Sequence, residues 1–451
     1  MSIQFDQSGN PATFPHFTND DVLISIPPGE IYHLHADVLR RCSPRFMGKL
    51  LAPQHAATLA KAAERAGAKT RFKLELMPSR DHPNGIFVRK GVDKYGQAIP
   101  SNMSSYVFFN SMYETPPISQ DTIDCWKNLF GTFYNIEPNL KGSSLQTVLE
   151  KCVRLMDTAE SIDAVVAVRP HVDNALMRQG QLVYRSVLAS PIPWGNLALR
   201  VHSPTIFNEA VVHLVGKWNS MLKQDKREMD PRLRAVCERK AEELYKIKGA
   251  AEMRIAGHIP PDCWRRADRD HISRASYSND VYMWMAISIR HQWFHQVVGI
   301  ERRGRDGVDG GARLYKAIYE EGPSYLNAED YVNFHNLCPM SQKARTILYD
   351  KVRQIKWEVR KYVKSLMQNK TQLELNSGAP IDHLLCTKVT AQDYLWNSED
   401  DDTAFVPSEL SDGDDEDGEG DRREGGVPPG VSDTLGTEFH PPGSEQTVDQ
   451  S

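Results

Sequence analysis

Near the start of the chain, the spacing of apolar residues changes from that of a strand to that of a helix. The first apolar residues alternate with polar ones, which is the period of two of a half-buried strand: Val22, Ile24 and Ile26. The turn-forming sequence Pro-Pro-Gly-Glu at 27–30 predicts that the chain folds back into a second strand. Further on the spacing becomes three to four, and Ser43 followed by Pro44 is typical of a helix start. The run 21–46 therefore predicts strand, turn, strand and two helices.

Helical periodicity dominates the later sequence. A short Ala-rich helix at 59–65 and a strand at 71–77 come first, and a turn-rich segment then ends in an aromatic strand at 106–109. We expect this last strand to pair within the sheet, with an edge contact to another chain as the alternative. Helices follow, most of them with one apolar face, at 122–134, 145–177 (two helices), 232–248, 281–298 and 341–370. The segment 281–298 is apolar on most sides and is expected to be the central buried helix of its region. The pattern predicts an α+β fold with a small sheet flanked by helices, followed by a mostly α-helical region.

Eight residues of the run 21–46 match a family pattern: an Asp-Val strand, an aromatic residue three positions before a His, Val-Leu on the next helix, then Ser and Phe. They are Asp21, Val22, Tyr32, His35, Val38, Leu39, Ser43 and Phe46. With these residues, the run resembles the opening of a BTB/POZ domain, and 122–134 and 145–177 look like later helices of that fold. The stretch 181–219 resembles the helical extension of fungal BTB proteins.

The resemblance implies a domain organisation. A flexible N-terminal arm, a BTB/POZ-like domain with an insertion, a helical extension, a linker and a disordered acidic tail are expected at 1–17, 18–179 (insertion about 78–118), 180–375, 376–398 and 399–451, respectively.

The resemblance also implies a function. It indicates a non-enzymatic protein-protein interaction module, acting as a homodimeric scaffold or adaptor, with recruitment of substrates to a cullin-type ubiquitin ligase as the more specific role. Ligase-recruiting members carry a hydrophobic-x-Glu element after the Phe of the second helix, and the residues after Phe46 contain none. The alternative is a nucleic-acid- or chromatin-associated regulatory factor, although no helix-turn-helix signature or interleaving of aromatic and basic residues points to it.

The net charge of −5 is distributed unevenly along the chain. Residues 399–451 hold 17 acidic residues and two arginines, a balance of −15, so residues 1–398 carry +10. The tail is rich in Gly, Pro and Ser, and such a composition buries too little apolar surface to offset chain entropy. We therefore expect a disordered tail that either keeps the protein soluble or competes with an acidic ligand for the basic body.

Residues 341–370 combine basic charge with one apolar stripe. The segment carries nine Lys or Arg residues against Asp350 and Glu358, a balance of +7, and Ser341 stands at the N-cap position. We expect the stripe to pack on the preceding helices with the lysines in water. The alternatives are an anionic membrane surface, a calmodulin-like partner or a phosphate backbone.

Composition and the first residues limit the class of protein to which the chain can belong. The sequence contains no apolar run of about 18 residues or more, and its first residues lack the basic and apolar regions of a secretory signal, so a soluble protein is expected. The seven cysteines are scattered, without a Cys-x-x-Cys pair, which favours reduced thiols in the cytosol or nucleus.

Candidates for chemistry are few. His291 and His295 have the i, i+4 spacing that zinc could use, but Gln292 stands where a catalytic zincin needs Glu, so core hydrogen bonding is expected instead. The glycine-rich loop at 304–311 lacks the preceding strand and the Gly-Lys-Ser/Thr ending of a phosphate-binding loop. The sequence predicts no enzyme, no metal site and no cofactor.

Overall fold

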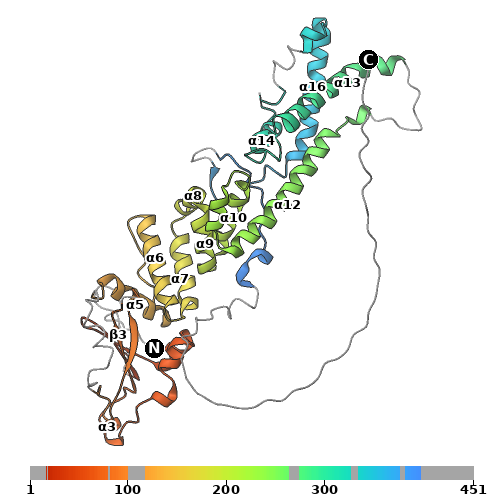
Figure 1. The fold of residues 1–451 in the computed structure, drawn as a ribbon. Coiled ribbons are helices and arrows are strands. Elements are labelled where there is room, and N and C mark those ends of the chain that lie inside the picture. Colours follow the sequence, from red (N-terminus) through yellow and green to blue (C-terminus); the bar gives the residue numbers. More distant parts are fainter. Residues whose placement is uncertain are drawn as a thin grey trace, which may run out of the picture. The chain divides into compact units, whose positions relative to one another are not determined.

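The computed structural model of the chain describes residues 17, 19–79, 82–99, 117–263, 274–322, 324–326, 334–375 and 381–397, with the side chains of 262 and 274–280 excepted. All of these residues belong to the first of the two units into which the chain divides, residues 1–401. The element order is a small sheet followed by helices (Figure 1). The expected α+β fold class is confirmed at this level.

The sheet has four strands in the order β2-β1-β3-β4. Strand β1 (Val22–Ile26) pairs antiparallel with β2 (Glu30–Leu34) and parallel with β3 (Phe72–Met77), and β3 pairs antiparallel with β4 (Ile86–Lys90). Every second residue of β1 and β3 is buried, as the alternating sequence predicts. Strand β4 lies within the turn-rich insertion expected at 78–118, so part of that insertion belongs to the sheet. The aromatic strand expected at 106–109 lies outside the described residues.

Short helical segments connect β2 to β3: α1 (Ala36–Cys42), α2 (Phe46–Leu50), a 3₁₀ turn (Pro53–His55) and α3 (Lys61–Arg65). Helix α2 begins at Phe46 with Arg45 as its N-cap, rather than directly after Ser43. The Ser43 hydroxyl still accepts a hydrogen bond from the Met47 backbone N–H at 3.0 Å and donates one to the Ile162 carbonyl. Ser43 therefore joins α2 to a distant helical loop as well as bonding the first turn.

Helix α5 (Gln120–Phe133) covers the apolar face of the sheet with aromatic side chains. The ring centroids of Trp126 and Phe87 are 4.7 Å apart, and those of Phe130 and Tyr32 are 5.8 Å apart. The Trp126 indole N–H donates to the Asn84 carbonyl at 2.9 Å, so the one polar atom of this buried ring is satisfied.

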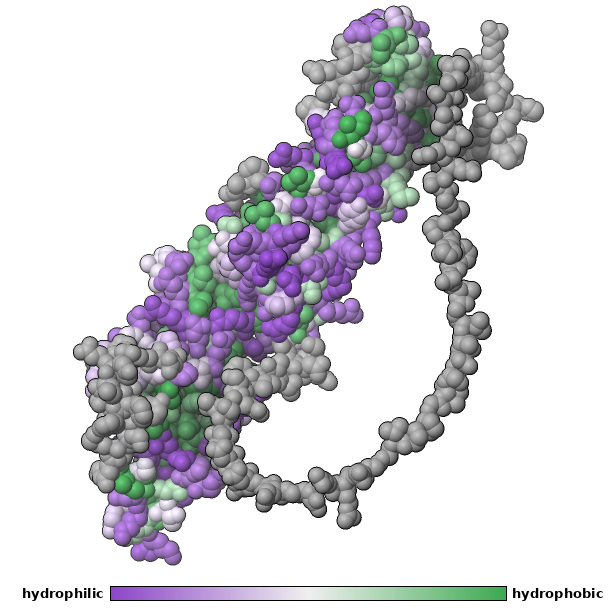
Figure 2. Space-filling model, in the orientation of Figure 1, coloured by the Kyte–Doolittle hydropathy of each residue, from purple (hydrophilic) through white to green (hydrophobic). Residues whose placement is uncertain are grey.

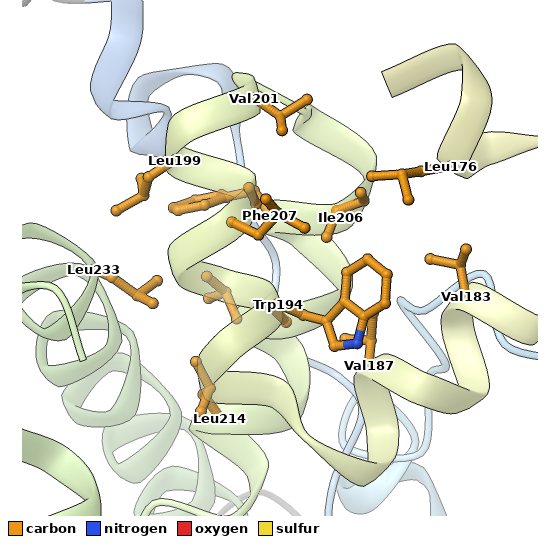
Figure 3. Packing of buried hydrophobic residues seen from close by; sticks show 14 of the residues in the cluster. Leu176, Val183, Val187, Trp194, Leu199, Val201, Ile206, Phe207, Leu214 and Leu233 are labelled. Carbon is orange, nitrogen blue, oxygen red and sulfur yellow. The ribbon is translucent and has the colours of Figure 1, made fainter. Parts of the chain in front are cut away.

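Five further helices continue from α5: α6 (Leu145–Glu160), α7 (Val165–Met177), α8 (Gln181–Ala189), α9 (Pro191–Val201) and α10 (Pro204–Gly216). Ser144 and Ser203 accept the backbone N–H three residues ahead and so cap α6 and α10. Figure 3 shows the Trp194 indole pointing toward Val183 and Val187 of α8 inside the apolar cluster of this region. The helices expected between 122 and 219 are therefore present.

The remaining helices are α11 (Lys223–Glu228), α12 (Pro231–Ala256), a 3₁₀ turn (Pro261–Cys263), α13 (Arg274–His295), which continues as a π-helix (Gln296–Ile300), α14 (Ala312–Glu320) and α16 (Gln342–Val363). Helix α13 buries Met283, Ile287 and the entire Arg290 side chain, but Trp284 is 44% exposed. The Arg290 guanidinium donates to the carbonyls of Ile255 and His258, which ties α13 to the end of α12. The segment predicted to be a central buried helix thus has an exposed side.

A strap, defined as residues 381–397, lies within the range 376–398 that the sequence analysis treats as a linker. It contains two short 3₁₀ turns, Ala391–Asp393 and Leu395–Asn397, and packs on α10 and α12. His383 and Asp393 are buried, and the ring centroid of Trp396 lies 5.4 Å from that of Phe207. The described part of this range is therefore held against the helices by specific contacts.

The surface drawn in Figure 2 is mostly hydrophilic, with apolar residues exposed in small groups. Among the described helices, none is long and apolar enough to cross a membrane.

Candidate functional site

Aromatic and basic side chains gather around a hollow of ≈ 350 Å³ between α14 and α16. Glu358 also lines it. We call the following five residues the basic aromatic surface: Tyr319, Trp357, Arg360, Lys361 and Lys364. Three cations against one carboxylate give this hollow a positive charge.

The sequence of α16 explains why these residues face outward. Its apolar stripe is almost completely buried, at Leu348, Val352, Ile355, Val359 and Val363, and Leu366 shortly after the helix is buried as well. The Ser341 hydroxyl accepts the Ala344 N–H at 3.3 Å and fixes the start of the helix. With the stripe buried, the basic residues are left on the opposite, exposed face. The expected packing of 341–370 is confirmed for α16, and its buried stripe is unavailable to a membrane or a partner helix.

Trp357 is the principal apolar group of the surface. Its exposed fraction is 67%, whereas the apolar stripe of the same helix is almost completely buried. Beside it, the Arg360 guanidinium lies 4.6 Å from the centroid of the Tyr319 ring and 3.8 Å from a Glu321 carboxylate oxygen. Because the cation–π contact and the carboxylate both restrain Arg360, its planar fork is preorganised.

Glu358 at the edge of the hollow is already engaged. One of its oxygens lies 2.8 Å from Nε2 of His258, and the other accepts from the Gln354 amide at 2.9 Å. Nδ1 of His258 lies 3.1 Å from the Tyr362 hydroxyl, so the imidazole connects the end of α12 to α16 through both ring nitrogens. Burial lowers the pKa of His258, against the opposing effect of its Glu358 partner. The carboxylate is therefore held by its neighbours on the protein.

Lys361 and Lys364 provide the unneutralised charge of the surface. Among the described residues, no carboxylate lies within ion-pair distance of either ammonium group. Lys361 Nζ instead lies 5.2 Å from the centroid of the Tyr362 ring. An exposed tryptophan next to such cations is the combination that recognises a partner segment with carboxylates and apolar side chains.

Two larger hollows have their charges compensated internally. The hollow between α5 and α6, of ≈ 620 Å³, contains an ion pair between Arg154 and Asp121. The hollow of ≈ 660 Å³ beside the π-helix contains a 2.7 Å pair between Arg303 and Glu301, with Asp309 and Asp382 also lining it. We therefore place the candidate site at the basic aromatic surface, although the α5–α6 hollow is larger.

The eight residues of the sequence signature lie in and around the sheet, away from this surface. Their side chains are buried or half-buried, and they hold the local fold: Asp21, Val22, Tyr32, His35, Val38, Leu39, Ser43 and Phe46. An Asp21 carboxylate oxygen accepts the Ala36 N–H at 2.7 Å at the start of α1. The His35 N–H donates to the Tyr134 hydroxyl at 2.9 Å, and its Nε2 lies 3.1 Å from Oδ1 of Asn19. In the structure these residues make packing and capping contacts.

The candidate chemical residues also make structural contacts. Nε2 of His291 lies 2.7 Å from the Ala256 carbonyl oxygen, so it connects α13 to α12. The ring centroids of His291 and His295 are 6.2 Å apart, and within the described ranges no three metal-ligating side chains form a group that could hold an ion.

A buried carboxylate that the sequence analysis did not identify holds the glycine-rich loop. Glu252 Oε1 accepts the Arg305 N–H and the Tyr315 hydroxyl, both at 2.7 Å. Gly311 has φ = 84° and precedes α14, where the Tyr315 ring leaves no room for a Cβ. The loop between the π-helix and α14 is thus a fixed turn on α12. Glu252 follows the helical spacing of its neighbours, so no sequence signal distinguished it.

The comparisons with known proteins contradict the BTB/POZ resemblance. The family model that matches the chain is that of the fungal FF domain, over residues 260–365, and no BTB/POZ model matches. A hairpin followed by two short helices needs buried alternating residues, a cap and a turn in any fold, so the eight-residue signature carries little family information. The homodimer and cullin expectations rested on that resemblance and are not retained.

No curated protein and no solved structure gives a significant match. The FF-domain match covers about a quarter of the chain and includes α13, α14 and α16. All five residues of the basic aromatic surface lie inside the matched range. Residues 260–365 are therefore similar to the FF domain, a protein-interaction module, which fits a general interaction role for the chain.

Proposed function

We propose that this protein is a non-enzymatic interaction module whose basic aromatic surface binds an acidic segment of a protein partner. The observation that supports it most is the exposed Trp357 beside Lys361 and Lys364, two cations without a carboxylate among their described neighbours. Electrostatic attraction steers and orients such a partner, and burial of the indole contributes affinity.

The acidic and histidine side chains that could act in catalysis are engaged in structural contacts, which supports binding rather than catalysis. Glu252, His258 and His291 lie at helix junctions and are engaged by neighbouring side chains or backbone groups. All seven cysteines are unpaired thiols, and burial raises the pKa of Cys152 and Cys237 to about 12, which keeps these thiols protonated. The unpaired, protonated thiols support a protein that works in the cytosol or nucleus.

The proposal is tested with a fluorescein-labelled 15-residue peptide that alternates Asp or Glu with Phe or Leu, titrated with the full chain and followed by fluorescence anisotropy. Trp357→Ala is expected to weaken binding about tenfold, the loss typical of truncating a tryptophan hot spot. The matched control is Trp284→Ala, because Trp284 on α13 is also exposed, at 44%, but lies outside the hollow. Equal affinities for the two variants would contradict the proposal.

A duplex DNA probe distinguishes the nucleic-acid alternative. Binding to phosphates weakens steeply with salt and does not require an exposed indole. If the full chain binds the duplex and not the acidic peptide at physiological salt, the surface is a nucleic-acid site and the proposed function is wrong.

A further inference from the structure

A lysine that is almost fully buried lines a hollow between the end of α10 and α12. We call this space, which has a volume of ≈ 620 Å³, the lysine hollow, and Asn219 and Lys248 are among its lining residues. Lys248 is only 5% exposed. A Cβ at Gly310 would lie 3.0 Å from Nζ of Lys248 and 3.8 Å from Nδ2 of Asn219, so the two side chains end beside the same glycine. The hollow therefore has a primary amine among its walls.

The ammonium group of Lys248 has no hydrogen-bond acceptor and no carboxylate within ion-pair distance among the described residues. Three carboxylates are near enough for their charges to act on it, those of Glu252, Asp306 and Asp309. Each of them already accepts a hydrogen bond from a different donor: the Tyr315 hydroxyl, the Tyr245 hydroxyl and the Gly311 N–H, respectively. Lys248 thus differs from the buried acids and histidines at the helix junctions, which are all engaged.

This environment favours the neutral amine form of Lys248. A buried ammonium without a partner is costly, and losing its proton removes that cost. Burial lowers the pKa of Lys248, although the charges of Cys386 and Glu252 act in the opposite direction. The neutral amine has a free lone pair and can attack an electrophilic carbon, as amines do with carbonyl compounds.

The charges that line the hollow favour an uncharged ligand over an anion. Two acids and two bases line it, Glu238 and Glu242 against Arg239 and Lys248, so they balance to zero. Arg239 already donates to Asp393 at 2.7 Å. An anion attracted to Lys248 would therefore also face two carboxylates, without a second free base to offset them.

The aromatic rings of the hollow already have cation partners. Lys226 Nζ lies 4.0 Å from the centroid of the Trp218 ring, and the Arg305 guanidinium lies 5.1 Å from that of Tyr245. A cationic ligand would have to compete with these two side chains. The other lining residues include four apolar ones: Val215, Ala235, Ala241 and Leu244. The hollow therefore suits a small uncharged molecule with an apolar body and one polar group.

We propose that Lys248 forms an imine with a small apolar aldehyde bound in the lysine hollow. The amine nitrogen forms a bond to the carbonyl carbon while a proton passes from nitrogen to the carbonyl oxygen. The resulting hydroxyl then leaves with the second amine proton as water, and the C=N bond forms. No oxidant or reductant is needed, and the modification is stoichiometric and reversible. This ligand site goes beyond the proposed interaction function, since it shares no residue with the basic aromatic surface.

Reductive trapping tests this proposal. The full chain is incubated with limiting hexanal and cyanoborohydride, which reduces an imine to a stable secondary amine, and the alkylated lysines are mapped by tandem mass spectrometry. Lys248 is expected to carry at least about fivefold more label than Lys246, an exposed lysine on the same helix, because the hollow holds the aldehyde beside the amine. Equal labelling of the two lysines, or more label at Lys246, would overturn the proposal.

A filled hollow provides a matched pair of variants. Ala241→Phe places a ring among the lining residues and is expected to reduce the label at Lys248 at least about fivefold. Ala250→Phe makes the same change at an exposed position of α12 outside the hollow, and should leave the label at Lys248 within about twofold of wild type. Equal labelling of Lys248 in both variants would show that the aldehyde does not react from within the hollow.

A comparison of two aldehydes in the wild-type chain needs no variant. Formaldehyde has no apolar tail to bury, so its ratio of label at Lys248 to label at Lys246 is expected to be at least about threefold lower than that of hexanal. The same ratio for both aldehydes would overturn the assignment of an apolar ligand to the hollow.

Discussion

The Arg239 guanidinium donates to Oδ1 of Asp393 at 2.7 Å, and this contact fixes the strap on α12. Lys240 Nζ lies 3.2 Å from the other carboxylate oxygen, which also accepts from the Thr390 N–H and hydroxyl. Burial alone would raise the pKa of Asp393, but its hydrogen bonds from Thr390, Arg239 and Lys240 lower it to about 2. A buried carboxylate with this many donors holds the strap on α12.

Asp393→Ala is expected to lower the free energy of unfolding by about 3 kcal/mol, because the nearly buried Lys240 would lose one of its two carboxylate partners and the Thr390 N–H and hydroxyl would lose their acceptor. Urea unfolding followed by circular dichroism measures this change. The control is Glu374→Gln, an exposed carboxylate in the preceding segment, which should change stability by less than about 0.5 kcal/mol. Equal effects of the two substitutions would show that the strap is not held by Asp393.

Stability is expected to fall as the pH drops from about 6.5 to 4. Burial lowers the pKa of His383 to about 4, although its hydrogen bond to Asp382 acts in the opposite direction. Between these two pH values the unfolded chain, whose histidine pKa is ~6.5, binds more protons than the folded chain. The stabilisation by neutral His383 is therefore fully present above pH ~6.5 and is lost as the pH falls to the folded pKa, with a maximum loss of about 3 kcal/mol. His383→Gln removes this titration, so unfolding free energies at pH 7, 5.5 and 4 should depend less on pH than in wild type. The same pH dependence in both proteins would contradict this assignment.

Gly216→Ala is expected to destabilise the strap by about 1–3 kcal/mol, the typical cost of overpacking. An added Cβ would collide with the Leu384 carbonyl oxygen and lie 2.5 Å from Cδ2 of His383. Gly48→Ala is the matched control, because a Cβ at Gly48 in α2 meets nothing within 4 Å. Hydrogen exchange of 381–397 should increase in the first variant alone, and unchanged protection would show that α10 and the strap are not in close contact.

The sequence predicted the parts of the fold that depend on local periodicity. Helix α16 could be predicted with its cap and buried face because five apolar residues recur along it at helical spacing. Strand β4 could not, because Ile86 and Phe87 follow a turn-rich segment and are ordered by pairing with β3. The strap has no periodicity either, and its burial depends on individual contacts such as that of Asp393.

The candidate site was only half visible in the sequence. The basic charge of α16 was evident, but the hollow also needs Tyr319 from α14, which is 38 positions before Trp357. Their proximity depends on the packing of two helices, which a single sequence does not specify. Nor could a single sequence indicate that Glu358 would be engaged by His258 and that Lys361 and Lys364 would have no carboxylate within ion-pair distance among the described residues.

The most direct test of the central claim compares two charge reversals on α16 in the full chain, with binding of the acidic peptide measured by anisotropy. Lys361→Glu/Lys364→Glu reverses the two cations of the surface, and Lys343→Glu/Arg345→Glu makes the same change in charge near the start of the helix, outside the hollow. The account predicts that the first pair weakens binding by at least about tenfold and the second by less than about twofold. Equal weakening by both pairs would show that the peptide responds only to net charge, and that the basic aromatic surface is not a binding site.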